Sequence, residues 1–71
     1  MKILALDTST KVSGYAVFNG NQLIRYSSID KSDETDGNVR MRDMVNDLSI
    51  LIEREAPDVV VIEETVVTRN P

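Results

Sequence analysis

The sequence predicts an α/β fold with the element order β-β-β-α-β, and three observations support it. Two short apolar runs, Ile3–Leu6 and Val59–Ile62, each end at an acidic residue, as strands buried on both faces do. A hairpin pattern follows the first run, and one helical pattern precedes the second. A strand–helix–strand crossover almost always makes its two strands parallel with right-handed topology. We therefore expect a mixed sheet in which a parallel pair carries an antiparallel hairpin.

The hairpin is predicted by two β-like runs around a turn signal. Gly14–Phe18 and Gln22–Ile29 flank Asn19-Gly20-Asn21, and Asn-Gly is typical of tight hairpin turns. Residues Asp30–Asn38 are polar and acidic and contain a glycine, which predicts a solvated loop leading into a helix. The spacing of the acids in that loop does not match a calcium-binding EF-hand.

A helix is predicted from Val39 to about Glu55. Its apolar residues recur at steps of three and four and so share one stripe: Met41, Met44, Val45, Leu48, Leu51 and Ile52. Met41 and Met44 are most simply core residues on that face. Pro57 prevents the helix from continuing. The next apolar run, Val59–Ile62, is expected to form another buried strand.

Composition narrows the chemistry. The 71 residues are 41% hydrophobic and 28% charged, which fits at most one globular domain, with a core that supplies about 3–5 kcal/mol. Because cysteine and histidine are absent, disulfides, Cys/His zinc sites and Ser-His-Asp triads are excluded. A net charge of −4 argues against a general nucleic-acid-coating surface, so any DNA contact must be local or supplied by other residues.

Location is also suggested by the sequence. No export signal is evident, and the longest apolar run, Val59–Ile62, is far shorter than the roughly 20 residues of a membrane-spanning helix. We expect a soluble, cytoplasmic protein with no membrane partner.

Asp7 and Glu63 are the candidate site residues. Each lies at the carboxyl end of an apolar strand, where open α/β sheets place their ligand sites. If those strands are parallel neighbours, the two carboxylates converge, and Mg²⁺ typically takes one or two carboxylates together with waters and phosphate. Each acid alone has a plain structural explanation, as a turn residue or a strand end. That explanation gives no reason for both strands to end on an acid.

Two further features of the sequence each have two interpretations. Glu64 competes with Glu63, because successive strand residues point to opposite faces and only one of them can share a site with Asp7. The segment Thr8-Ser9-Thr10-Lys11 could line a phosphate, although a hydroxyl-rich turn after a strand is usually only a turn.

Two segments carry a resemblance to a known family. Ile3–Phe18 (ILALDTSTKVSGYAVF) resembles the opening of RuvC-type Holliday junction resolvases, through Asp7, Ser9 and the pair Gly14-Tyr15. Ala56–Pro71 (APDVVVIEETVVTRNP) is similar to the second signature of that family, through Pro57-Asp58 and Ile62-Glu63. Matching on the Ile-Glu pair favours Glu63 over Glu64.

The resemblance implies that residues 1–71 are the N-terminal part of a single ribonuclease H-like domain, truncated before its C-terminal helices and last strand. The implied activity is metal-dependent endonucleolytic hydrolysis of phosphodiesters at four-way DNA junctions, with branched DNA as the partner and a homodimer as the complete form. Two Mg²⁺ ions about 3.5–4 Å apart would act in such a site. Asp7 would anchor or bridge the metals and Glu63 would hold one of them.

The resemblance also implies two further aspartates on a C-terminal helix, which this chain does not reach. We therefore expect the chain alone to be inactive as a nuclease, and to self-associate through an exposed sheet edge. One alternative is a part of an actin-like ATPase related to tRNA threonylcarbamoylation proteins, in which Asp7–Thr10 would face a nucleotide phosphate and Glu63 would have no role. Another is a truncated, non-catalytic domain that only folds and associates.

Overall fold

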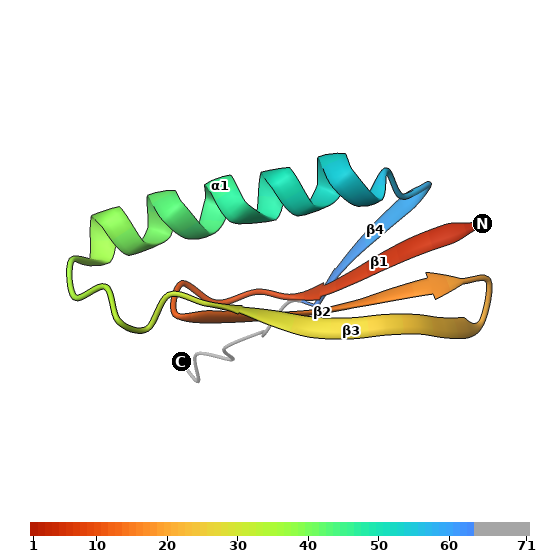
Figure 1. Ribbon diagram of the computed structural model, residues 1–71, viewed down its shortest axis with the longest axis horizontal. Helices are drawn as coiled ribbons and strands as arrows, with labels where there is room; N and C mark the ends of the chain where they lie inside the picture. Colours follow the sequence, from red (N-terminus) through yellow and green to blue (C-terminus); the bar gives the residue numbers. More distant parts are fainter. Residues whose placement is uncertain (64–71) are drawn as a thin grey trace, which may run out of the picture.

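The computed structural model describes residues 1–63 and shows a mixed four-stranded sheet with one helix on one face (Figure 1). The elements are β1 (Lys2–Asp7), β2 (Val12–Asn19), β3 (Gln22–Asp30), α1 (Gly37–Glu55) and β4 (Val59–Glu63). The strand order is β3-β2-β1-β4, with β1 parallel to β4 and antiparallel to β2. The predicted α/β class, the element order, the hairpin and the parallel pair are all confirmed.

The core lies between the sheet and α1. Leu4, Leu6 and Val17 from the strands are buried against Leu51 of the helix. The partly buried apolar residues that surround this cluster are Tyr15, Ile29, Leu48 and Ile52. Because side chains alternate along β1, Leu4 and Leu6 face the helix while Ala5 and Asp7 belong to the opposite, open face of the sheet.

Two predictions about burial are wrong. Met41 was expected in the core but is 55% exposed, and Val45 on the same stripe is 57% exposed, so only part of the stripe packs against the sheet. The apolar residues Val59–Ile62 of β4 were expected to be buried and are 37–56% exposed. The reason is position: β4 is an edge strand, and within residues 1–63 no element packs on its outer side or on the open face (Figure 1).

Local capping interactions define the ends of the helix. Asp36 caps its start, accepting hydrogen bonds from the backbone N–H groups of Asn38 (3.0 Å) and Val39 (3.3 Å). This cap explains why α1 begins at Gly37, two residues before the predicted start. At the other end, Ala56 adopts the left-handed conformation (φ 44°) and donates its N–H to the Ile52 carbonyl at 2.9 Å. Pro57 follows immediately, as predicted.

A reciprocal pair of hydrogen bonds fixes where β4 starts relative to β1. The Lys2 N–H donates to the Asp58 carboxylate at 2.8 Å, and the Asp58 N–H donates to the Lys2 carbonyl, also at 2.8 Å. The register that follows pairs Ile3 with Val59 and, at the far end, Asp7 with Glu63.

An ionic cluster joins the end of α1 to the sheet. The Glu55 side chain is only 4% exposed and accepts hydrogen bonds from Arg25 of β3, with Nε at 2.9 Å from Oε1, while Lys2 Nζ lies 3.4 Å from Oε2. These hydrogen bonds hold the pKa of the Glu55 carboxyl below its ordinary value; burial opposes the shift, and the charges of Arg25 and Lys2 add to it. The same partner raises the pKa of the Arg25 guanidinium.

No helix in the described part of the chain is long and apolar enough to cross a membrane.

Candidate functional site

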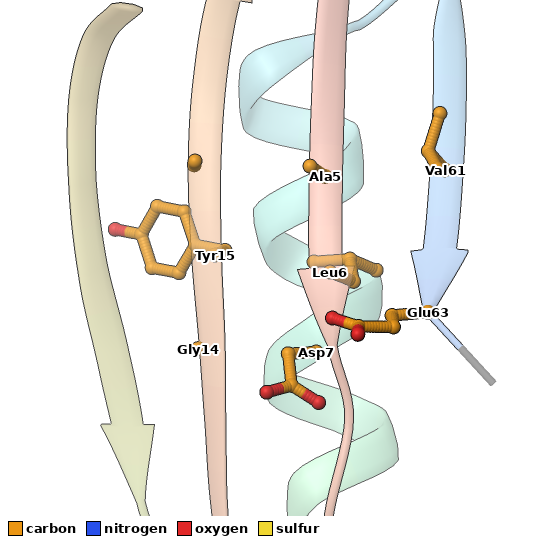
Figure 2. Close-up of a pocket in the computed structure, with 8 residues that line it drawn as sticks. Ala5, Leu6, Asp7, Gly14, Tyr15, Val61 and Glu63 are labelled. Carbon is orange, nitrogen blue, oxygen red and sulfur yellow. The ribbon is translucent and has the colours of Figure 1, made fainter. Parts of the chain in front are cut away.

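Asp7 and Glu63 lie side by side at the carboxyl ends of two parallel strands. They are register partners on β1 and β4, and neighbouring strands in a sheet are about 4.8 Å apart. Partners in register point to the same face, so both carboxylates lie on the open face, away from α1. Figure 2 shows the Glu63 side chain extending from β4 toward the end of β1, where the Asp7 carboxylate lies. As the sequence predicted for parallel strands, Asp7 and Glu63 are therefore neighbours on one face of the sheet.

An open cavity of about 490 Å³ accompanies the two acids. It is lined by Ala5, Leu6, Asp7, Gly14, Tyr15, Ala16, Val61 and Glu63. Gly14 is the register partner of Asp7 on β2, and a Cβ placed on it would meet no atom of residues 1–63 within 4 Å. Among residues 1–63, the space beside Asp7 at Gly14 is therefore not filled by another side chain.

Small residues keep this space open, a role that was not predicted from the sequence. Ala5 of β1 is the register partner of Ala16 on β2, and Asp7 is the partner of Gly14. A local signal existed, because alternate positions of each strand carry small side chains next to the candidate acid. It could be interpreted only once the register between β1 and β2 was known.

The two carboxylates form an uncompensated pair of negative charges. Both side chains are exposed, and none of the hydrogen bonds or ion pairs found within residues 1–63 involves either carboxylate. Two like charges on neighbouring strands repel one another, and a divalent cation between them would remove that repulsion. The donor set also fits Mg²⁺, which prefers oxygen ligands and usually takes one or two carboxylates, with waters and substrate phosphate completing its coordination.

Asp7 and Glu63 remain a pair in the described part of the chain. No group of three or more His, Cys, Asp or Glu side chains is gathered in positions suited to a metal ion among residues 1–63. Glu64, the competing acid in the sequence, lies outside the described residues.

The loop between β1 and β2, which could have lined a phosphate beside Asp7, lies next to the helix instead. Thr8, Ser9 and Thr10 line a separate cavity of about 330 Å³ on the helix side, against Met41, Met44, Val45 and Leu48. The Ser9 hydroxyl accepts a hydrogen bond from the Lys11 N–H at 3.3 Å, which is a local turn interaction. The loop residues therefore do not line the cavity that holds the two carboxylates.

Comparison of the chain with models of protein families, with curated proteins and with solved structures finds no match.

Proposed function

We propose that this chain is the N-terminal part of a RuvC-type, ribonuclease H-like nuclease domain that hydrolyses phosphodiesters in branched DNA with Mg²⁺. The observation that carries the proposal is the pairing of Asp7 with Glu63 at the carboxyl ends of parallel neighbours, beside the open space at Gly14. The element order β-β-β-α-β and the position of the helix agree with what the family resemblance implies.

The residues suit a metal-assisted hydrolysis. Asp7 and Glu63 would hold the cation through carboxylate oxygens, with the strand pairing fixing their separation. Gly14 and the small residues beside it leave room for a phosphate and its waters. When bound, Mg²⁺ supplies Lewis-acid activation of the phosphate and of an attacking water. The full ligand set and the DNA-binding surface belong to the proposed complete domain.

The actin-like ATPase alternative explains less of this geometry. It uses Asp7 and the loop that follows, and it gives Glu63 no role. In the structure Glu63 is aligned with Asp7, whereas the loop residues Thr8–Thr10 line the other cavity. The paired carboxylates therefore favour the nuclease proposal.

A metal titration tests the proposal. Mn²⁺ accepts the same oxygen ligands as Mg²⁺ and can be followed by electron paramagnetic resonance. We expect saturable binding to the 71-residue chain, and we expect Asp7→Asn and Glu63→Gln each to weaken it by about tenfold or more, because each removes one of two charged ligands. The matched control is Asp33→Asn, which removes the same charge from an exposed loop position.

The variant Gly14→Val tests whether the cation needs the open space at position 14. A side chain at position 14 enters open space, so the variant should fold, while the added methyl groups should crowd the cation and weaken its binding. Absence of saturable Mn²⁺ binding, or binding that is indifferent to both Asp7→Asn and Glu63→Gln, would overturn the proposal. Saturable ATP binding that Asp7→Asn removes and Glu63→Gln leaves intact would support the ATPase alternative instead.

A further inference from the structure

Ser13 of β2 is a fully buried hydroxyl with an unusual pair of partners. Its side chain is 0% exposed, and it alternates with Tyr15 and Val17 on the helix-facing side of the sheet. Its Oγ donates a hydrogen bond to the Ser9 carbonyl at 2.8 Å and accepts one from the Ser9 N–H at 3.1 Å. One side chain therefore satisfies both polar groups of the Ser9 backbone.

This pair of hydrogen bonds, here called the Ser13 clamp, lies next to the proposed metal ligands. Ser9 follows Asp7 by two residues, and Ser13 immediately precedes Gly14, which is the register partner of Asp7. The clamp thus closes the connection between β1 and β2 directly beyond the position of the Asp7 carboxylate.

The clamp also determines the direction that the chain takes after Asp7. Ser13 faces the helix whereas Asp7 faces the open side, so the hydrogen bonds to Ser9 draw the loop toward α1. Thr8, Ser9 and Thr10 accordingly line the cavity against the helix. The loop stays off the open face, and the space in front of Asp7 and Gly14 remains clear.

We propose that Ser13 is a positioning residue for Asp7, holding the loop away from the carboxylate pair so that Asp7 and Glu63 can share a cation. The inference rests on the proposed metal-binding function. Within residues 1–63, no hydrogen bond or ion pair involves the carboxylate of Asp7 or that of Glu63. The placement of Asp7 therefore depends on its backbone, which is held by strand pairing before it and by the clamp after it.

The test combines Mn²⁺ affinity with amide hydrogen exchange at Ser9, measured by nuclear magnetic resonance on the 71-residue chain. In Ser13→Ala we expect faster exchange of the Ser9 N–H and Mn²⁺ binding weaker by about tenfold, the lower end of what groups behind metal ligands contribute. Ser13→Thr keeps the hydroxyl and should restore both quantities to near their wild-type values. If Ser13→Ala does not fold, Ser13→Cys, whose thiol is a weaker donor and acceptor than a hydroxyl, should also show faster exchange at Ser9 and weaker Mn²⁺ binding.

Two controls separate positioning from general destabilisation. Val17→Ala removes buried volume from the same strand without touching the clamp, and Ser49→Ala removes a hydroxyl bonded to the Val45 carbonyl on the exposed helix surface. Both should bind Mn²⁺ as the wild type does. Wild-type affinity in Ser13→Ala, or equal weakening in Val17→Ala, would overturn the role of Ser13 and leave the metal site standing. Absence of binding by the wild-type chain would instead overturn the proposed function and the positioning role together, while the exchange rate at Ser9 would still report whether the clamp forms.

Discussion

At the scale of single residues, the acid at the end of the helix and the acids at the strand ends have opposite environments. Glu55 is buried and bound by Arg25 and Lys2, whereas Asp7 and Glu63 are exposed and contact no cation in residues 1–63. A buried carboxylate that is hydrogen-bonded to one cation and ion-paired with a second is a structural contact. An exposed, unneutralised pair beside open space is instead available to a ligand.

The Glu55 cluster leads to a prediction about acid stability. Hydrogen bonds from Arg25 lower the pKa of Glu55, so its contribution to stability is complete above the unfolded-state pKa of about 4.3 and is lost as the pH falls through the lower folded-state pKa. We expect the free energy of unfolding in urea to be level from pH 7 to about pH 5 and to decline below that. Glu55→Gln should flatten this decline.

A second carboxyl contributes to the same pH range. Hydrogen bonds from the Ser32 hydroxyl and N–H lower the pKa of Asp30, so a shallow decline should remain in Glu55→Gln and disappear when Asp30→Asn is added. An unchanged acid profile in Glu55→Gln would show that the ion pair contributes no net stability to the folded chain.

The sequence predicted that Asp7 and Glu63 are neighbours better than it predicted the buried polar contacts of the fold. Asp7 and Glu63 could be found because an apolar run that ends on an acid is a local pattern, and crossover rules make such strands parallel. The Arg25–Glu55 contact spans 30 residues and depends on where the helix end meets β3. The sequence contains no local pattern that would pair them. The burial of Ser13 could not be predicted from the sequence either, because it follows from the packing of β2 in the fold.

At the scale of secondary-structure elements, the alignment of β4 with β1 decides whether the carboxylates meet. A slip of one residue would place Glu63 on the opposite face from Asp7, since strand side chains alternate. Asp58 resists that slip through its hydrogen bond from the Lys2 N–H at the start of the pair. Asp58 thus has a structural role in this chain, in the alignment of β4 with β1.

Replacement of Asp58 should weaken both the strand pair and the site. In Asp58→Ala we expect a loss of about 1 kcal/mol in the free energy of unfolding, typical of one hydrogen bond, and faster amide exchange along β4. Asp58→Asn keeps a side-chain oxygen acceptor and should stay near the wild type. A loss in Asp58→Asn equal to that in Asp58→Ala would assign the effect to the charge rather than to the hydrogen bond.

The element-scale errors of prediction share one physical cause. Periodicity identifies the apolar side of α1 and the apolar character of β4, but it does not show which neighbour covers each residue. Met41 and Val45 border the cavity at the β1–β2 loop, and β4 has no strand beyond it within residues 1–63. The hydrophobic pattern of the sequence predicted the elements and their order. Which residues are buried depended on how the helix and the sheet pack together.

At the scale of the whole molecule, residues 1–63 form a sheet that the helix covers on one side and that no described element covers on the other (Figure 1). Exposed apolar residues on its strands include Leu23, Tyr26, Val59, Val61 and Ile62. An edge strand with unpaired backbone groups and apolar side chains is a template for pairing with another chain. These features agree with the self-association expected from the sequence, which stays a prediction.

Sedimentation velocity tests that prediction in the 71-residue chain. We expect the average mass to rise with concentration, because β4 is an edge strand within residues 1–63 and carries exposed apolar side chains that pairing would cover. Val61→Lys places a charge on that strand and should keep the chain monomeric, since charges on edge strands oppose pairing. Val45→Lys is the matched control, because Val45 is similarly exposed but lies on the helix. A wild-type mass independent of concentration, or equal effects of the two lysines, would show that β4 is not the surface through which copies associate.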